Sequence, residues 1–236
     1  MNKSLSSPPD LGLFLNHLHE KFGKFIILRG YDFLPNSYTN DIDVYVPIKD
    51  LARFVDCINN LDGIESNLEI LISRFGLMKC ELVLNGVVIP FDILYGFYYA
   101  GLKYQDCDQL FSNSKMHSCG LFSIPDISDE VRISLLKELL HNGRVRSDKA
   151  SYLLKNMDKC AGDIPTDYFD TETINVVRDA IVSASYYLPK VPQAIKVKLL
   201  VHNLRKNCAQ TVKNMFMFVA VKYVLKNEYH KRITRL

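Results

Sequence analysis

The sequence lacks the cysteine pattern of a disulfide framework or a structural zinc site. Its six cysteines are scattered, and no two of them form a C-x-x-C pair. Both classes of site need dense or paired cysteines. The six histidines show no H-x-x-x-H pairing, so a histidine-based metal site is not expected either. We therefore expect reduced thiols in a cytoplasmic protein.

The chain also lacks the hydrophobic segments that carry proteins to or across a membrane. Residues 1–10 have no apolar region of the kind found in a secretory signal. The longest unbroken apolar run, residues 215–221, is far shorter than the roughly 20 residues that span a bilayer. No targeting or membrane-spanning segment is expected.

Acidic residues are nearly absent from the last part of the chain. Residues 190–236 contain eleven lysines and arginines and one acid, Glu228, so this segment carries a charge of +10. Because the whole chain carries +3, the first 189 residues sum to −7. Such a charge asymmetry bears on which charged partners the protein can bind, and it does not determine the fold.

What the sequence does contain is typical of a folded protein. With 236 residues, of which 48% are hydrophobic and 23% charged, the chain can bury a sizeable core. Residues 10–22 have apolar side chains at helical spacing, and residues 25–28 are a short apolar run typical of a buried strand. Residues 30–40 are rich in loop-forming types.

Strict alternation of apolar and polar side chains predicts a strand at residues 41–46. One face carries Ile42, Val44 and Val46, and the other carries Asp41, Asp43 and Tyr45. A helix at 48–60 and a strand near 68–75 are expected to follow. Asn85-Gly86 then predicts a hairpin between residues 79–84 and 87–95.

From about residue 126 the apolar period becomes helical. A first helix is expected to end at Asn142-Gly143, and Ser147 is placed to cap a second. Two or three more helices are expected between residues 171 and 228. We predict an α/β (α+β) protein with a small mixed sheet in a domain of residues 1–125 and a helical domain of residues 126–236.

Three aspartates are candidates for metal binding. Asp41 and Asp43 project side by side from one face of a strand, and Asp92 is the one acid in an apolar strand. A buried acid is costly unless it is paired or bound to a metal. Carboxylates bind Mg²⁺, and pairs of such ions promote nucleotidyl and phosphoryl transfer. The alternative is that Asp41 and Asp43 are merely hydrated side chains at the start of a strand and that Asp92 forms a structural ion pair.

These motifs resemble the polymerase β-like nucleotidyltransferase superfamily. The shared pattern is an apolar strand ending in Arg29-Gly30, a loop, the Asp41-Ile42-Asp43 strand and a later third acid in Phe91-Asp92-Ile93. The closer likeness is to nucleotidyltransferase-like proteins of bacterial surface-polysaccharide gene clusters, and it covers roughly residues 25–155. It implies a nucleotidyltransferase in which Asp41, Asp43 and Asp92 are catalytic and hold Mg²⁺ or Mn²⁺. The implied substrates are a nucleotide donor and a small-molecule or glycan acceptor.

The sequence departs from this superfamily at one position. The glycine is usually followed by a serine that holds the nucleotide phosphates, whereas Gly30 is followed by Tyr31. Arg29 is a candidate to replace the lost contact, so Arg29, Gly30 and Tyr31 are predicted to bind the nucleotide. Four basic residues of the second domain are further phosphate-binding candidates, with a solvated basic face as the alternative. They are Lys137, Arg144, Arg146 and Lys149.

Three other functions compete with an active nucleotidyltransferase. Tyr31 favours a catalytically degenerate module that binds a nucleotide or a partner. A D-x-D glycosyltransferase is disfavoured because only one strand precedes Asp41, whereas such enzymes build a nucleotide pocket from several earlier units. A minimal antitoxin-type nucleotidyltransferase would be shorter and would show the Gly-Ser pair.

The basic tail alternates apolar and basic side chains. Val212, Met215, Phe216, Phe218, Val219 and Tyr223 alternate with Lys213, Lys222 and Lys226. Such a helix can lie on an anionic membrane, or it can pack on its own protein with its lysines in water, which is the arrangement we expect. Nucleic acid is disfavoured because the tail shows no aromatic and basic interleaving of a known reader module.

Overall fold

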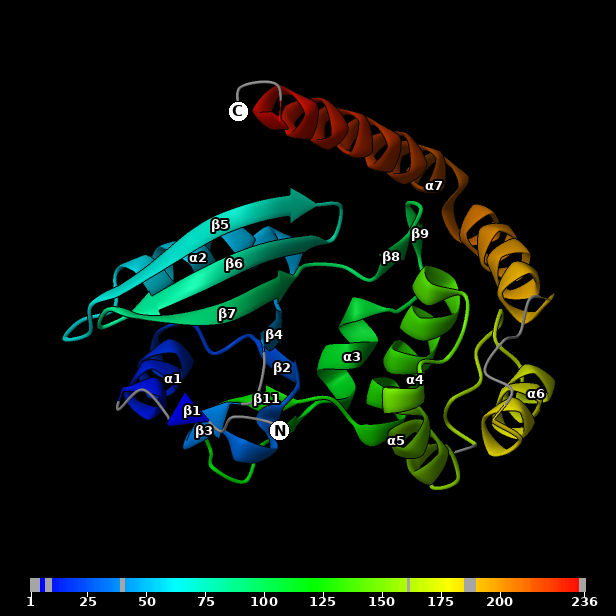
Figure 1. Cartoon of the computed structure of the whole chain (residues 1–236), viewed down its shortest axis with the longest axis horizontal. Coiled ribbons are helices and arrows are strands. Elements are labelled where there is room, and N and C mark those ends of the chain that lie inside the picture. Colours follow the sequence, from blue (N-terminus) through cyan, green and yellow to red (C-terminus); the bar gives the residue numbers. More distant parts are fainter. Residues whose placement is uncertain (1–4, 7–9, 39–40, 161, 185–189, 234–236) are drawn as a thin grey trace. The chain divides into compact units, whose positions relative to one another are not determined.

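The computed structural model describes residues 5–6, 10–38, 41–160, 162–184 and 190–233 (Figure 1). These residues form a mixed α/β protein with a central mixed sheet and a helical C-terminal region, which confirms the predicted fold class.

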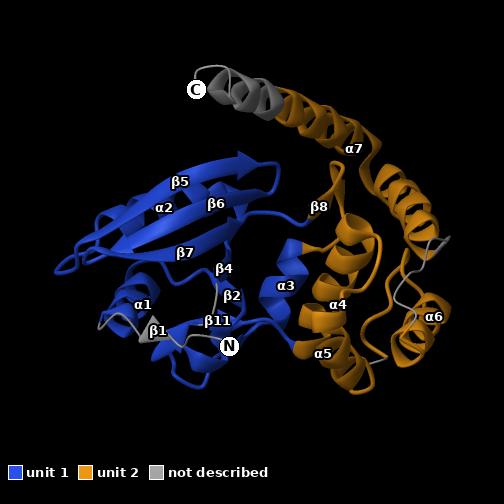
Figure 2. Ribbon diagram, viewed as in Figure 1, with its two compact units in different colours: residues 1–97, 107–126 blue, residues 98–106, 127–236 orange. Residues whose placement is uncertain are grey.

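The chain divides into two compact units (Figure 2). The first comprises residues 1–97 and 107–126, and the second comprises residues 98–106 and 127–236. Whether the chain folds as separate domains of residues 1–125 and 126–236 stays a prediction.

The first unit is built on a seven-stranded sheet with the order β10-β11-β2-β4-β7-β6-β5. Its strands are β2 (Ile26–Arg29), β4 (Ile42–Tyr45), β5 (Ser66–Arg74), β6 (Leu77–Leu84), β7 (Val87–Leu94), β10 (Lys115–Met116) and β11 (Ser123–Ile124). Strand β4 runs antiparallel to β2 and parallel to β7, and β5, β6 and β7 form an antiparallel meander. The turn between β6 and β7 is Asn85-Gly86, as predicted, and both residues have positive φ (46° and 78°), which suits a two-residue hairpin.

Helices α1 (Leu11–Lys21) and α2 (Leu51–Asn59) pack on one face of this sheet. The alternation predicted for residues 41–46 is confirmed, because Ile42, Val44 and Val46 all lie in the core between the helices and the sheet. Short elements complete the unit. They are β1 (Leu5–Ser6), η1 (Tyr31–Phe33), β3 (Ser37–Tyr38), η2 (Ile48–Asp50) and α3 (Cys107–Asn113).

The second unit is helical apart from a small hairpin. Its elements are β8 (Tyr98–Tyr99), β9 (Leu102–Lys103), α4 (Ile127–Lys137), the π-helical turn η3 (Glu138–Asn142), α5 (Ser147–Met157), α6 (Thr171–Val182) and α7 (Lys190–Ile233). Gly143 ends η3 in the left-handed conformation, as predicted. The prediction that Ser147 caps α5 is wrong: the capping position is Arg146, whose backbone is extended, and Ser147 is the first helical residue.

Helix α7 consists of two helical segments separated at Asn207, whose φ and ψ of −162° and 94° are not helical. The side chain of Asn207 accepts a hydrogen bond from the backbone N–H of Gln210 at 3.0 Å. This is the geometry of an N-cap, so Asn207 ends the first segment and starts the second. Among the described residues, we find no helix with the length and apolar character needed to pass through a membrane.

Candidate functional site

Four charged side chains lie in one row across four adjacent strands of the first unit. Arg29 on β2 is opposite Asp43 on β4, and Asp43 is opposite Asp92 on β7. Asp92 in turn is opposite Lys79 on β6. The row therefore has two carboxylates at its centre and a cation at each end.

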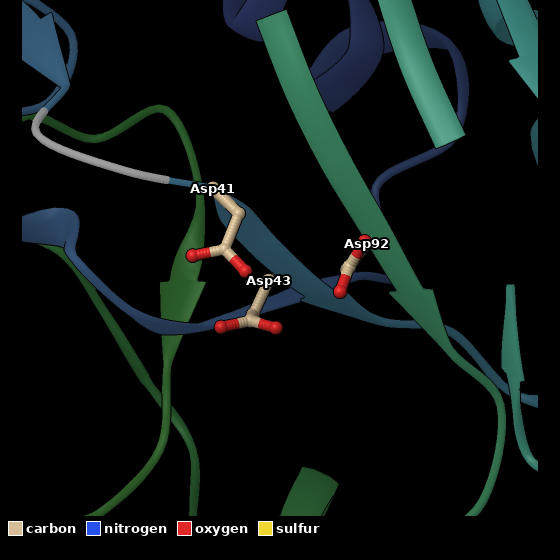
Figure 3. A group of neighbouring side chains, drawn as sticks. All are labelled: Asp41, Asp43 and Asp92. Atoms are coloured by element: carbon tan, nitrogen blue, oxygen red, sulfur yellow. The ribbon is translucent and has the colours of Figure 1, made fainter. Parts of the chain in front are cut away.

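Asp41, immediately before β4, joins the two central carboxylates. Each of Asp41, Asp43 and Asp92 offers a carboxylate oxygen, and these atoms all lie within 4.8 Å of one another. Figure 3 shows the three side chains directed toward a common point from β4 and β7. Three carboxylates at such separations repel one another, and a cation among them relieves that repulsion. The sequence-based expectation that the three acids converge is thus confirmed.

The acids lie on the sheet face opposite to the one that α1 and α2 cover. Asp43 and Asp92 are nonetheless buried, with exposed fractions of 3% and 8%, while Asp41 is partly exposed. Tyr45 follows two residues after Asp43 on the same face of β4, and its ring lies 5.3 Å from that of Phe97 and 5.5 Å from that of Phe111 of α3, measured between centroids. Along β4 the side chains on this face therefore pass from the partly exposed Asp41 to the buried Asp43 and Tyr45.

Arg29 and Lys79 compensate the three negative charges in part. Arg29 donates a hydrogen bond from Nε to Asp43, and its Nη2 lies 3.6 Å from Asp41 Oδ2. Lys79 Nζ lies 3.5 Å from Asp92 Oδ2. Both side chains remain partly exposed, at 37% and 44%, so each can turn toward a ligand at the site.

Burial and neighbouring charges shift the pKa values of the site. Burial raises the pKa of Asp92, the negative charges of Asp43 and Asp41 add to the rise, and Lys79 opposes it. Burial acts to lower the pKa of Arg29, but attraction to Asp43, Asp41 and Asp92 outweighs it and the pKa is raised. A raised pKa makes the Asp92 carboxylate a stronger base than an exposed one.

Gly30 and Tyr31 form the turn after β2. Gly30 has a φ of 73°, and Tyr31 begins η1. The Tyr31 ring meets the His117 ring edge-on at 6.0 Å, and His117 stacks on Phe122 at 4.7 Å. Tyr31 is thus positioned by ring contacts on the loop before β11, and nucleotide binding by this turn stays a prediction.

The four basic candidates of the second domain lie in the second unit. Arg146 is engaged by the buried Glu138, whose carboxylate accepts hydrogen bonds from Arg146 Nε at 3.0 Å and 3.1 Å and from its backbone N–H at 3.2 Å. Arg144 is exposed, Lys149 is partly exposed, and Lys137 is the last residue of α4. Phosphate binding by these residues stays a prediction, and Arg146 has a structural role in addition.

Lys79 is a candidate site residue that the sequence analysis missed. The signal was present in the predicted hairpin, because a two-residue turn at Asn85-Gly86 pairs Leu84 with Val87. Counting back along both strands from that pair places Lys79 opposite Asp92. The position of a cation beside the third acid was therefore available from the sequence.

No known protein family matches the sequence, and no curated protein matches it either. Among solved structures, the chain is similar to MenT4, the nucleotidyltransferase toxin Rv2826c from Mycobacterium tuberculosis H37Rv. The similarity covers 87% of this chain and 90% of that one, with 11% sequence identity and a TM-score of 0.37.

Proposed function

We propose that the chain is a metal-dependent nucleotidyltransferase, which transfers a nucleotidyl or phosphoryl group to a hydroxyl acceptor. The observation that carries this proposal is the convergence of Asp41, Asp43 and Asp92 within 4.8 Å, flanked by Arg29 and Lys79. Phosphoryl-group chemistry needs this combination of anionic metal ligands and cations for the phosphates.

The donor atoms of the site fit Mg²⁺ or Mn²⁺. All three groups are carboxylates, which are the hard oxygen ligands that these ions prefer, and no thiol or imidazole belongs to the group. When bound, the ions would supply Lewis-acid activation of the phosphorus centre and neutralise developing charge. Asp41, Asp43 and Asp92 are the residues that would hold them.

Each acid has a distinct place in the proposed mechanism. Asp43 lies two residues from Asp41 on one strand and directly opposite Asp92 on the next, and it is the residue proposed to bridge two ions. Asp92 is proposed to take the proton of the attacking hydroxyl, as the third acid of the group. Asp41 is partly exposed and completes the ligand set.

Arg29 and Lys79 are proposed to bind the phosphates of the donor. In the structure both are paired with the acids that would hold the ions. If metal ions neutralised those acids, the two cations would become available to phosphate oxygens. The planar guanidinium of Arg29 suits a bidentate contact with a phosphate. This assigns to Arg29 the phosphate contact that a serine after Gly30 usually makes in the superfamily.

The acceptor and the biological process are carried by the sequence resemblance alone. It favours a glycan or small-molecule hydroxyl as acceptor and a role in surface-polysaccharide biosynthesis. The same resemblance supports the phosphate-binding candidates of the second unit.

A nucleotide panel tests the proposal. The intact chain is mixed with each nucleoside triphosphate and nucleotide-sugar, with and without Mn²⁺, and its thermal unfolding is followed. A true ligand at a hundred times its Kd stabilises the folded state by about 2.7 kcal/mol. We expect stabilisation by one donor class that depends on Mn²⁺ and is absent in Asp43→Asn. Stabilisation that is the same without Mn²⁺, or in Asp43→Asn, would overturn the metal-dependent site.

A catalytically degenerate nucleotide-binding module is the second candidate function, and Tyr31 favours it. The Tyr31 side chain stands where the superfamily has its phosphate-binding serine, and it is held against His117. The two functions differ in turnover. The active enzyme consumes the donor in the presence of acceptor. It releases pyrophosphate when it transfers the nucleotidyl group of a nucleoside triphosphate, a sugar phosphate when the donor is a nucleotide-sugar, and a nucleoside diphosphate when it transfers the terminal phosphoryl group. The degenerate module binds the donor without consuming it.

A further inference from the structure

The second segment of α7 exposes a continuous apolar stripe. Val212, Phe216, Val219 and Tyr223 have exposed fractions of 57%, 74%, 63% and 67%. Their spacing of four, three and four residues places them on one side of the helix. These four side chains therefore face outward.

The second unit holds this helix by a different side. Thr211 is buried, and the backbone at Met215 is in close contact with the β8–β9 hairpin. A Cβ atom added to Gly101 in that hairpin would lie 2.6 Å from Met215 Cα. The apolar stripe is therefore displayed by a helix that its own unit already fixes in place.

The positive charge around the stripe limits the kind of partner that can bind over it. From Lys190 to Tyr223 the chain has seven lysines and arginines and no acid. Lys213 follows Val212 and Lys222 precedes Tyr223, and both are exposed. One residue corresponds to about 100° around a helix, so these two lysines lie on opposite sides of the stripe. The surface is thus apolar along its centre and basic along both edges.

We propose that this face of α7, defined by Val212, Phe216, Val219, Tyr223, Lys213 and Lys222, binds an anionic lipid surface. The stripe would enter the boundary between headgroups and acyl chains, and the flanking lysines would contact the headgroup phosphates. A second copy of this face is a poor partner, because two such helices repel each other. Nucleic acid offers phosphates but no apolar phase for the centre of the stripe.

Vesicle sedimentation of the full chain tests the proposal. The vesicles are phosphatidylcholine alone or phosphatidylcholine mixed with phosphatidylglycerol. We expect the chain to sediment with the mixed vesicles at low salt and to be released at high salt. Phe216→Asp and the double variant Lys213→Glu, Lys222→Glu should each lower the partition coefficient at least tenfold. The matched controls are Phe33→Asp, an exposed phenylalanine of the first unit, and Lys24→Glu, Lys115→Glu, which changes the net charge equally.

An introduced tryptophan gives a second readout, because the sequence contains none. The emission of Phe216→Trp should shift to shorter wavelength with anionic vesicles only, and that of Phe33→Trp should not shift. The proposal is overturned by any of four results. The first two are that the chain binds neutral vesicles as well as anionic ones, and that Phe216→Asp binds vesicles as the parent does. The other two are that the emission of Phe216→Trp is already blue-shifted without vesicles, and that the chain self-associates through residue 216 without binding vesicles. A nucleic acid oligomer is also added as a competitor of the anionic vesicles. If it displaces them, and if Phe216→Asp binds the oligomer as tightly as the parent does, the lysines bind nucleic acid and the lipid proposal is wrong.

Discussion

Asp43 on β4 and Asp92 on β7 lie directly opposite each other in a parallel strand pair. Like charges in this position destabilise a sheet, and both side chains are buried. Arg29 on β2 and Lys79 on β6 flank the two acids and reduce the repulsion, but two cations cannot neutralise the three carboxylates. An arrangement that is unfavourable for stability and directed at one point is expected at a functional site.

Replacement of single acids should separate metal binding from turnover. We expect Asp41→Asn and Asp43→Asn to weaken Mn²⁺ binding by ~10-fold or more. Mutation of residues that only hydrogen-bond to a metal ligand already lowers metal affinity by about 10- to 100-fold. Asp92→Asn should retain nucleotide binding but lose turnover. Calorimetric titration with Mn²⁺ measures the first effect, and circular dichroism checks that each variant is folded.

Glu81→Gln is the control for these variants, because Glu81 lies two residues from Lys79 on the same strand and outside the acid group. It should bind Mn²⁺ as the parent does. Equal Mn²⁺ affinity in the parent and all three aspartate variants would contradict the metal site and leave the acids a structural role.

Loss of the Lys79 charge should have opposite effects on the metal and on the donor. Lys79→Met removes a cation 3.5 Å from Asp92, so Mn²⁺ affinity should rise by up to ~5-fold, as expected from about 1 kcal/mol between unit charges at this distance in water. Donor binding should fall in the same variant, because a phosphate contact is lost. Both affinities can be measured by calorimetry, and Lys115→Met serves as an exposed control. A fall in both affinities would instead indicate that Lys79 acts by holding the sheet together.

Gly101 should be required for the contact between the β8–β9 hairpin and α7. Gly101→Ala places a Cβ within 2.6 to 2.8 Å of backbone atoms of Asn214 and Met215, at a φ of 84° that disfavours any side chain. Gly143→Ala has a similar φ of 69° but meets nothing within 4 Å. We expect Gly143→Ala to cost about 1–2 kcal/mol and Gly101→Ala to cost ~1–3 kcal/mol more. Urea unfolding measures the difference, and hydrogen exchange should show faster exchange at residues 208–223 in Gly101→Ala alone.

The buried pair of Asp129 and Arg132 should dominate the polar contribution to stability in the second unit. Arg132 also donates to Gln105 at 3.0 Å and to the carbonyl of Asp163 at 3.0 Å, so it ties α4 to two other segments. Arg132→Met leaves the fully buried Asp129 without its cation, and we expect a loss of ~3–5 kcal/mol in urea unfolding. Lys206→Met, which breaks an exposed pair with Asp106, should cost less than ~1 kcal/mol. Similar losses in the two variants would contradict this ranking.

The sequence by itself determined the elements that have a strong local signal. Helix α1, strand β4 and the Asn85-Gly86 turn lie where they were predicted, because helical spacing, strict alternation and turn chemistry each act over a few residues. The two-residue strands β8 and β9 were missed, since so short a strand has no period to detect. The alternation of β4 also determined which face carries Asp41 and Asp43.

Only the tertiary structure decided what surrounds those acids. The parallel pairing of β4 with β7 sets Asp43 opposite Asp92, and no local pattern encodes that pairing, because it forms only after the β5–β6–β7 meander returns to the centre of the sheet. Likewise, the sequence showed Arg146 only as a basic residue, whereas the fold buries Glu138 beside it. The spacing along α7 showed an apolar stripe, but only packing at Gly101 and Thr211 decided which side of the helix stays exposed. Local periodicity specifies the face on which a side chain lies, and burial by distant segments decides what that face contacts.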